Sequence, residues 1–105
     1  WRVELGKWLG EMKRVLRRDS YIVLFESLGT GNESPIQLEH LKDYYPWLDE
    51  VGFQNKWFRT DYKFASVEEA EELSRFFFGD ELGDKVRANN RVILPECTGG
   101  WWLKV

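Results

Sequence analysis

The sequence predicts an α/β fold in which helices alternate with strands. Apolar side chains recur at spacings of three and four residues across 3–17, and a continuous apolar run follows at 21–25. From 54 to 64 apolar and polar residues alternate, which is the two-residue period of a strand. With the later segments, these patterns give the order helix, strand, helix, strand, helix, strand.

The first two elements form an incomplete unit. The helix at 3–17 leads into Tyr21–Phe25, whose continuous apolar character is typical of a strand buried on both faces. A helix followed by such a strand is half of a strand–helix–strand unit, because parallel strands require a crossover. We therefore expect a further strand upstream of Trp1, which is not preceded by Met.

The middle of the chain combines a loop, interrupted helical spacing and a strand. Residues 28–35 are expected to form a polar loop. A helix is expected to about Tyr44, followed by a short second turn that begins at Pro46 and ends at Gly52. The alternating segment 54–64 then predicts one strand.

The last third predicts a capped helix and two extended segments. Ser66–Glu69 has the pattern of a capping box, and Gly79 is expected to end the helix that follows. A strand is predicted over 91–97, a bend at 98–100, and further extended chain at 101–105. Spacing alone leaves parallel and antiparallel pairing open for the last two strands.

Composition excludes several classes of protein. The 105 residues fit a single domain, and a net charge of -3 argues against a dedicated nucleic-acid binder. No apolar run approaches the length of a membrane span. One cysteine, Cys97, fits a reducing, cytosolic setting, and with His40 as the single histidine a Cys/His zinc site is not expected.

The first candidate site follows the predicted strand 21–27. Glu26, Ser27 and Thr30 are candidate pocket residues, because ligands in open α/β sheets bind at the carboxyl ends of the strands. The alternative is that these side chains only cap the loop. Gly29–Gly31 lacks the third glycine of a dinucleotide-binding loop, so a phosphate site is disfavoured.

A second group of candidates lies in 57–62. Arg59 and Asp61 share one strand face, which predicts either a simple ion pair or the polar rim of a pocket. In the pocket reading, Trp57 and Tyr62 supply the walls.

Two aromatic segments remain. Glu96 lies close to Trp101 and Trp102, an arrangement that suits an amine-bearing ligand or, alternatively, tryptophans that fill the core. Cys97 is expected to be a small buried thiol. Phe76–Phe78 cannot all face one side of a helix, so at least one ring is expected to point away from the core.

One stretch resembles a known family. Leu9–Arg17 leading into Tyr21–Glu26 looks like the helix that runs into the fifth strand of class I S-adenosylmethionine-dependent methyltransferases. The sequence departs from that pattern at Arg18–Ser20, where Pro-Gly-Gly is usual. Most of the rest is similar to the C-terminal half of an uncharacterised bacterial branch of the family. Its segments are 44–48, 52–53, 59–64, 76–79 and 95–102.

The resemblance implies a fold class and a site. It implies the C-terminal part of a doubly wound, Rossmann-like sheet of about three strands, mixed in direction, with three or four helices. The family's last strand runs antiparallel between the fifth and sixth. The acceptor side is implied at Glu26, Ser27, Thr30, Asp61, Tyr62 and Trp101.

The resemblance also implies cofactor and partners. The family's S-adenosylmethionine-binding loops would lie upstream of Trp1, so this chain alone is expected to bind no cofactor and to be inactive. Its partners would be the missing N-terminal half, a small-molecule acceptor, and a second copy docked through strand 21–27 or Phe76–Phe78. The alternative is a stand-alone ligand-binding or dimerising module.

Overall fold

The structure is a computed structural model of residues 1–105. It contains four α-helices, one 3-10 helix and five strands. In chain order these are α1 (Arg2–Val15), β1 (Tyr21–Thr30), η1 (Glu39–Leu41), α2 (Tyr44–Glu50), β2 (Gln54–Arg59), β3 (Tyr62–Lys63), α3 (Val67–Phe78), α4 (Asp80–Asn89), β4 (Ile93–Leu94) and β5 (Glu96–Lys104). The predicted alternation of helix and strand is confirmed at this coarse level.

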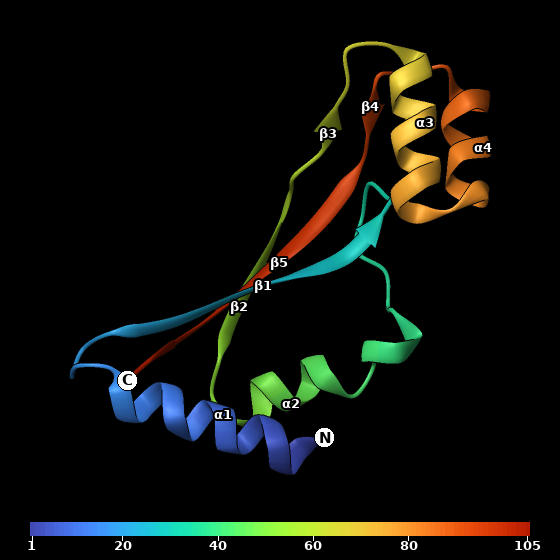
Figure 1. Cartoon of the computed structure of the whole chain (residues 1–105). Coiled ribbons are helices and arrows are strands. Elements are labelled where there is room, and N and C mark those ends of the chain that lie inside the picture. Colours follow the sequence, from blue (N-terminus) through green and yellow to red (C-terminus); the bar gives the residue numbers. More distant parts are fainter.

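The main sheet has the strand order β1-β5-β2. The last strand, β5, therefore lies in the centre and pairs antiparallel with both neighbours. β1 and β2 consequently run in the same direction without touching as a pair (Figure 1). The predicted mixed sheet is wrong in this respect, because the one strand that separates the two parallel elements leaves only antiparallel pairs. β1 is an edge strand.

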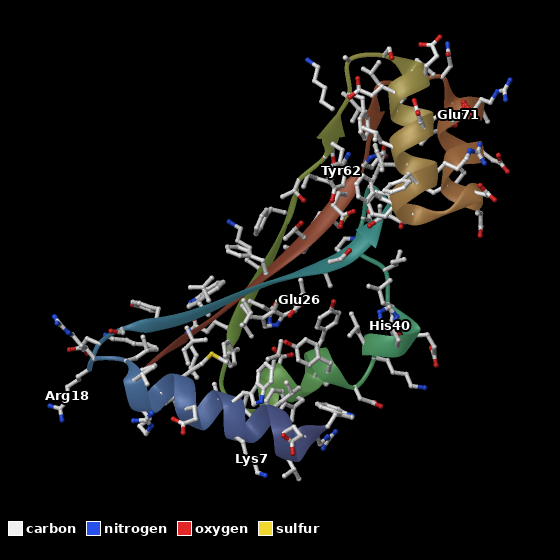
Figure 2. All side chains as sticks on the ribbon, viewed as in Figure 1. Lys7, Arg18, Glu26, His40, Tyr62 and Glu71 are labelled. Carbon is white, nitrogen blue, oxygen red and sulfur yellow. The ribbon has the colours of Figure 1, made fainter.

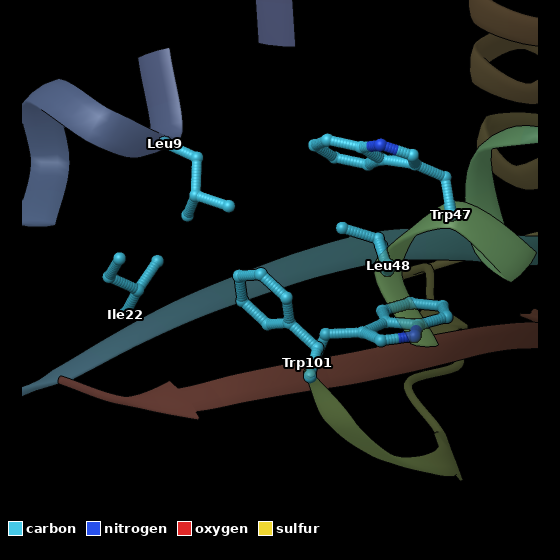
Figure 3. Close-up of a cluster of buried hydrophobic side chains, with 6 residues drawn as sticks. Leu9, Ile22, Trp47, Leu48 and Trp101 are labelled. Atoms are coloured by element: carbon cyan, nitrogen blue, oxygen red, sulfur yellow. The ribbon is translucent and has the colours of Figure 1, made fainter. Parts of the chain in front are cut away.

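Helices α1 and α2 pack on one face of this sheet (Figure 1). The side chains between them form the main hydrophobic core (Figure 3). Its six buried members are Leu9, Ile22, Trp47, Leu48, Phe53 and Trp101. Alternate residues of β1 and β5 point to this face, which fixes the register of the two strands.

The opposite face of the sheet carries no helix. Val23 and Phe25 on β1 are 53% and 67% exposed, whereas Ile22, next to Val23 on the same strand, is 5% exposed. The prediction that 21–25 is buried on both faces is therefore wrong. The apolar run is continuous, but only its alternate residues meet the helices. We call the exposed side chains of Tyr21, Val23, Phe25 and Phe58 the open face.

Several predicted elements differ from those of the structure. The helix expected to about Tyr44 is only a 3-10 helix at Glu39–Leu41, α2 begins at Tyr44, and the strand predicted over 91–97 is divided between β4 and β5. β1 continues to Thr30, so the loop begins later than expected. The strand predicted over 54–64 is divided into β2 and β3, which belong to different sheets. The bend predicted at 98–100 is absent: Gly99 and Gly100 lie within β5, where a side chain at Gly99 would come within 2.5 Å of the Trp101 ring. Here glycine accommodates close packing instead of a turn.

The helix signals hold better. The Ser66 hydroxyl accepts a hydrogen bond from the Glu69 backbone N–H at 3.1 Å, which confirms the predicted cap of α3. Gly79 ends α3 and leads directly into α4. Pro46 falls in the first turn of α2, where a missing N–H costs little. All three rings of Phe76–Phe78 are exposed, more than the one required by helical geometry.

The segment from β3 to β4 forms a separate small unit beyond the end of the main sheet (Figure 1). β3 and β4 pair with each other, and α3 packs against α4 over a core of Ala70, Val86 and Leu94. We call this segment, 62–94, the excursion. The two cores make an elongated molecule of 48 × 25 × 21 Å.

Candidate functional site

A cavity of about 700 Å³ lies where the excursion meets the main sheet. Its sheet side is formed by the chain just after β1, at Gly31 and Glu33, and at the end of β2, at Arg59. α4 and the residues before β5 form the other side. The volume is that of a typical small-molecule site. The carboxyl ends of β1 and β2 thus border this cavity.

Gly31 allows α4 to close over this end of the sheet. Its φ is +83°, a region that side-chain-bearing residues rarely adopt. A Cβ there would approach Leu82 of α4 to 2.7 Å. The Gly31 N–H donates to the Pro95 carbonyl at 2.7 Å, so the loop after β1 is also tied to the start of β5.

An ion pair forms one wall of the cavity. Arg59 donates from Nε and Nη2 to the two oxygens of Asp61, each at 2.8 Å. Asp61 Oδ1 also accepts the Glu96 backbone N–H at 3.0 Å. The Arg59 guanidinium, and then the Glu96 N–H, hold the pKa of Asp61 below its usual value. The pair thus joins the end of β2 to the start of β5, as the ion-pair reading expects. Trp57 and Tyr62, the walls expected in the pocket reading, do not line this cavity.

Glu96 is buried behind this wall. The residue is only 5% exposed, and its Oε1 accepts a hydrogen bond from the Ser27 hydroxyl at 2.8 Å. Oε2 is buried with no hydrogen-bond partner. The Thr60 N–H donates to the Glu96 carbonyl at 2.9 Å. Buried carboxyl oxygens normally accept hydrogen bonds, so the unpaired Oε2 of Glu96 is an unusual feature of this fold.

A second polar group lies on the helix-covered face, around Glu26. The Tyr44 hydroxyl donates to Glu26 Oε1 at 3.0 Å, and the Tyr45 hydroxyl donates to the Ser27 carbonyl. The Tyr45 ring stacks on Trp101 with centroids 4.9 Å apart. Burial, and then the bond to Glu26, raises the pKa of Tyr44 to about 12. These contacts dock α2 onto the sheet.

Stability is expected to fall at high pH through Tyr44. The raised pKa means that its contribution is complete below the ordinary pKa of 10.0 and is lost as pH rises toward 12, since the unfolded chain releases its proton first. Urea unfolding between pH 8 and 11.5 measures this loss. Tyr44→Phe is expected to start from a lower stability and decline less steeply, and an unchanged slope would contradict this role. The slope that remains is assigned to Tyr45, whose pKa is also raised by burial.

The structure divides the sequence-predicted site residues into three places. Ser27 and Asp61 both contact Glu96, and Thr30 is the β1 residue paired with it. Glu26 lies between the sheet and α2, well away from Tyr62 at the start of the excursion (Figure 2).

The other predicted aromatic residues do not line the cavity. Trp101 is 4% exposed and belongs to the main core. Tyr62 stacks on Phe64 and contacts the Phe78 ring at 5.9 Å.

Sequence reasoning missed part of the cavity lining. Glu33, Lys85 and Arg91 come from three segments that are distant along the chain. Local patterns place Glu33 in a loop and Arg91 at the start of a predicted strand, and they single out no role for Lys85. Only the excursion brings them to one cavity, so no short motif marks them.

Cys97 is wholly buried, and its thiol donates to the Asn32 carbonyl with the sulfur 3.3 Å from the oxygen, as expected of a small buried thiol.

The structure contains no cluster of three His, Cys, Asp or Glu side chains suited to a metal ion. None of its helices is both long and apolar enough to span a membrane.

No family model, no curated protein and no solved structure matches this chain. Functional inference therefore rests on strand order, exposed surface and the cavity.

Proposed function

We propose that this chain is the C-terminal portion of an S-adenosylmethionine-dependent methyltransferase and supplies its acceptor side. The strand order carries the proposal. The resemblance implies a last strand inserted antiparallel between the fifth and sixth strands, and β5 lies in this way between β1 and β2. A chain of consecutive hairpins would instead place β2 beside β1, so the observed order is informative.

The shape of the chain supports an incomplete domain. Its radius of gyration is 17.0 Å, whereas about 13 Å is typical of a compact domain of this length. It exposes 7587 Å², against about 6,200 Å² for a compact monomer of this mass. In a doubly wound fold, both faces of the sheet are covered by helices. The open face and the free edge of β1 are the surfaces that additional chain would cover.

The cavity supports an acceptor site. It borders the carboxyl ends of β1 and β2, the side of an open α/β sheet on which ligands bind. The excursion closes over this side from the stretch between β2 and β5. Arg59 and Asp61 position the start of β5 beneath it. In the proposed enzyme these residues shape the pocket, and positioning of the acceptor supplies much of the catalysis.

Cofactor binding tests the proposal. The 105-residue chain is expected to give no heat with S-adenosylmethionine in calorimetry, because none of its strands is followed by the family's glycine-rich loop. The product of the same reading frame extended upstream of the Trp1 codon is expected to bind the cofactor in the micromolar range. Mutating the glycines of the upstream loop is the matched control.

Two results would overturn the proposal. One is an upstream reading frame without a strand and glycine-rich loop. The other is tight binding of the cofactor by the 105 residues alone.

A further inference from the structure

We propose that the cavity binds a small organic anion with an apolar body, and that Lys85 and Arg91 hold its charge. The inference deepens the proposed function by naming a class of acceptor, and it rests on the cavity being the acceptor site. It is carried by the charges around the cavity and by what each of them already contacts.

The charged groups of the lining differ in whether other groups of the protein already bind them. Arg59 is bound through two nitrogens to Asp61, and Asp61 receives a third donor from the Glu96 N–H. This pair is therefore electrostatically satisfied without a ligand. Lys85 and Arg91 form no ion pair and no side-chain hydrogen bond with any residue of the chain.

Glu33 is the one acid that opposes this assignment. Hydrogen bonds to Asp61, and to a smaller extent the charge of Glu33, raise the pKa of Arg59. The Glu33 backbone carbonyl also accepts a hydrogen bond from Arg59 Nη1 at 3.5 Å. Glu33 and Asp61 thus both face Arg59. The remaining two cations leave the cavity with a net positive lining in a protein whose total charge is -3.

The uncharged part of the lining combines apolar side chains with Asn89 and Asn90. Leu82 and Val86 of α4 and Leu94 of β4 border the cavity, and Val86 and Leu94 are 6% and 3% exposed. Such side chains favour an aromatic or aliphatic body over a bare inorganic ion, while few polar groups fix its orientation. Lys and Arg both bind carboxylates through charge-assisted hydrogen bonds. The ligand class that fits is therefore a carboxylate attached to a ring or short alkyl chain.

Three probes with the same phenyl body test the charge preference. Phenylacetate, phenylacetamide and phenethylamine are titrated into the ¹⁵N-labelled 105-residue chain, without cofactor, and amide shifts are followed by NMR. Phenylacetate is expected to shift residues 82–94 and to bind about tenfold more tightly than the neutral amide, the ratio expected for one charge-assisted contact. The amine is expected to bind most weakly.

Substitutions locate the site. Lys85→Gln and Arg91→Gln are each expected to weaken phenylacetate severalfold and, together, to remove its advantage over the amide. Lys13→Gln on α1 is the matched control and is expected to change nothing. Equal affinity for the acid and the amide, tightest binding of the amine, or shifts outside the cavity would each overturn the inference. Because S-adenosylmethionine is absent from these titrations, their failure leaves the cofactor test of the proposed function standing on its own.

Discussion

Replacing Trp101 with alanine is expected to lower the free energy of unfolding by about 3–5 kcal/mol, the usual cost of deleting a large buried aromatic side chain. Trp101 is 4% exposed, stacks on Tyr45 and belongs to a core of only six buried residues. The total free energy of unfolding of a small domain is about 5–15 kcal/mol. Because this chain buries less surface than is usual for its size, the variant is expected to be largely unfolded at 25 °C.

Urea unfolding followed by far-UV circular dichroism measures this effect. Trp57→Ala is the matched control, because Trp57 lies on β2 of the same sheet but is 47% exposed. It is expected to cost less than about 1 kcal/mol, as surface substitutions usually do. Trp101→Phe keeps a ring in the core and is expected to fall between the two. Similar losses for Trp101→Ala and Trp57→Ala would contradict the assignment of Trp101 to the core.

The sequence predicts where helices and strands lie along the chain better than it predicts which other elements pack against them. Helical spacing located α1, and the hydroxyl at Ser66 followed by Glu69 located the start of α3, because a cap is a local interaction. The continuous run at 21–25 correctly indicated a strand. It did not indicate how many faces are covered, since that depends on which other elements pack against the strand.

The errors share a physical origin. Gly99 and Gly100 have the composition of a turn, but they lie in β5 because the Trp101 ring occupies the space beside Gly99. The alternation in 54–64 continues through Thr60 and Asp61, where the chain leaves one sheet for another. Ring packing and sheet exchange are tertiary events, and a period of two residues carries no information about them.

The candidate site was predictable only in part. Ser27 was found because polar residues after a strand are a local signal, and Asp61 because it shares a strand face with Arg59. Both contact Glu96. Lys85 and Arg91 reach the cavity through the excursion, whose packing depends on contacts between α3, α4 and β4. Such a site depends on how the strands and helices are arranged in space, so local sequence patterns cannot predict it.

The open face has a further consequence for the isolated chain. Val23 and Phe25 are more than half exposed, and β1 has a strand partner on one side only. Its ten residues contain one charge, Glu26, which is bonded to Tyr44 on the helix side. Natural edge strands are usually protected by charges, bulges or covering segments. Along most of β1, the edge and the open face together form an unprotected surface for another strand.

The isolated chain is therefore expected to self-associate through β1, and sedimentation velocity at tens of micromolar is expected to show a dimer or a larger species. Val23→Lys with Phe25→Lys adds two charges to exposed positions, so the variant is expected to fold and to sediment as a monomer. Phe76→Lys, on a ring 79% exposed in α3, is the matched control and is expected to leave association unchanged. If Phe76→Lys separates the copies and the β1 variant does not, the contact lies at Phe76–Phe78. A monomeric parent chain would instead show that charge and backbone solvation at β1 outweigh the burial of its apolar face.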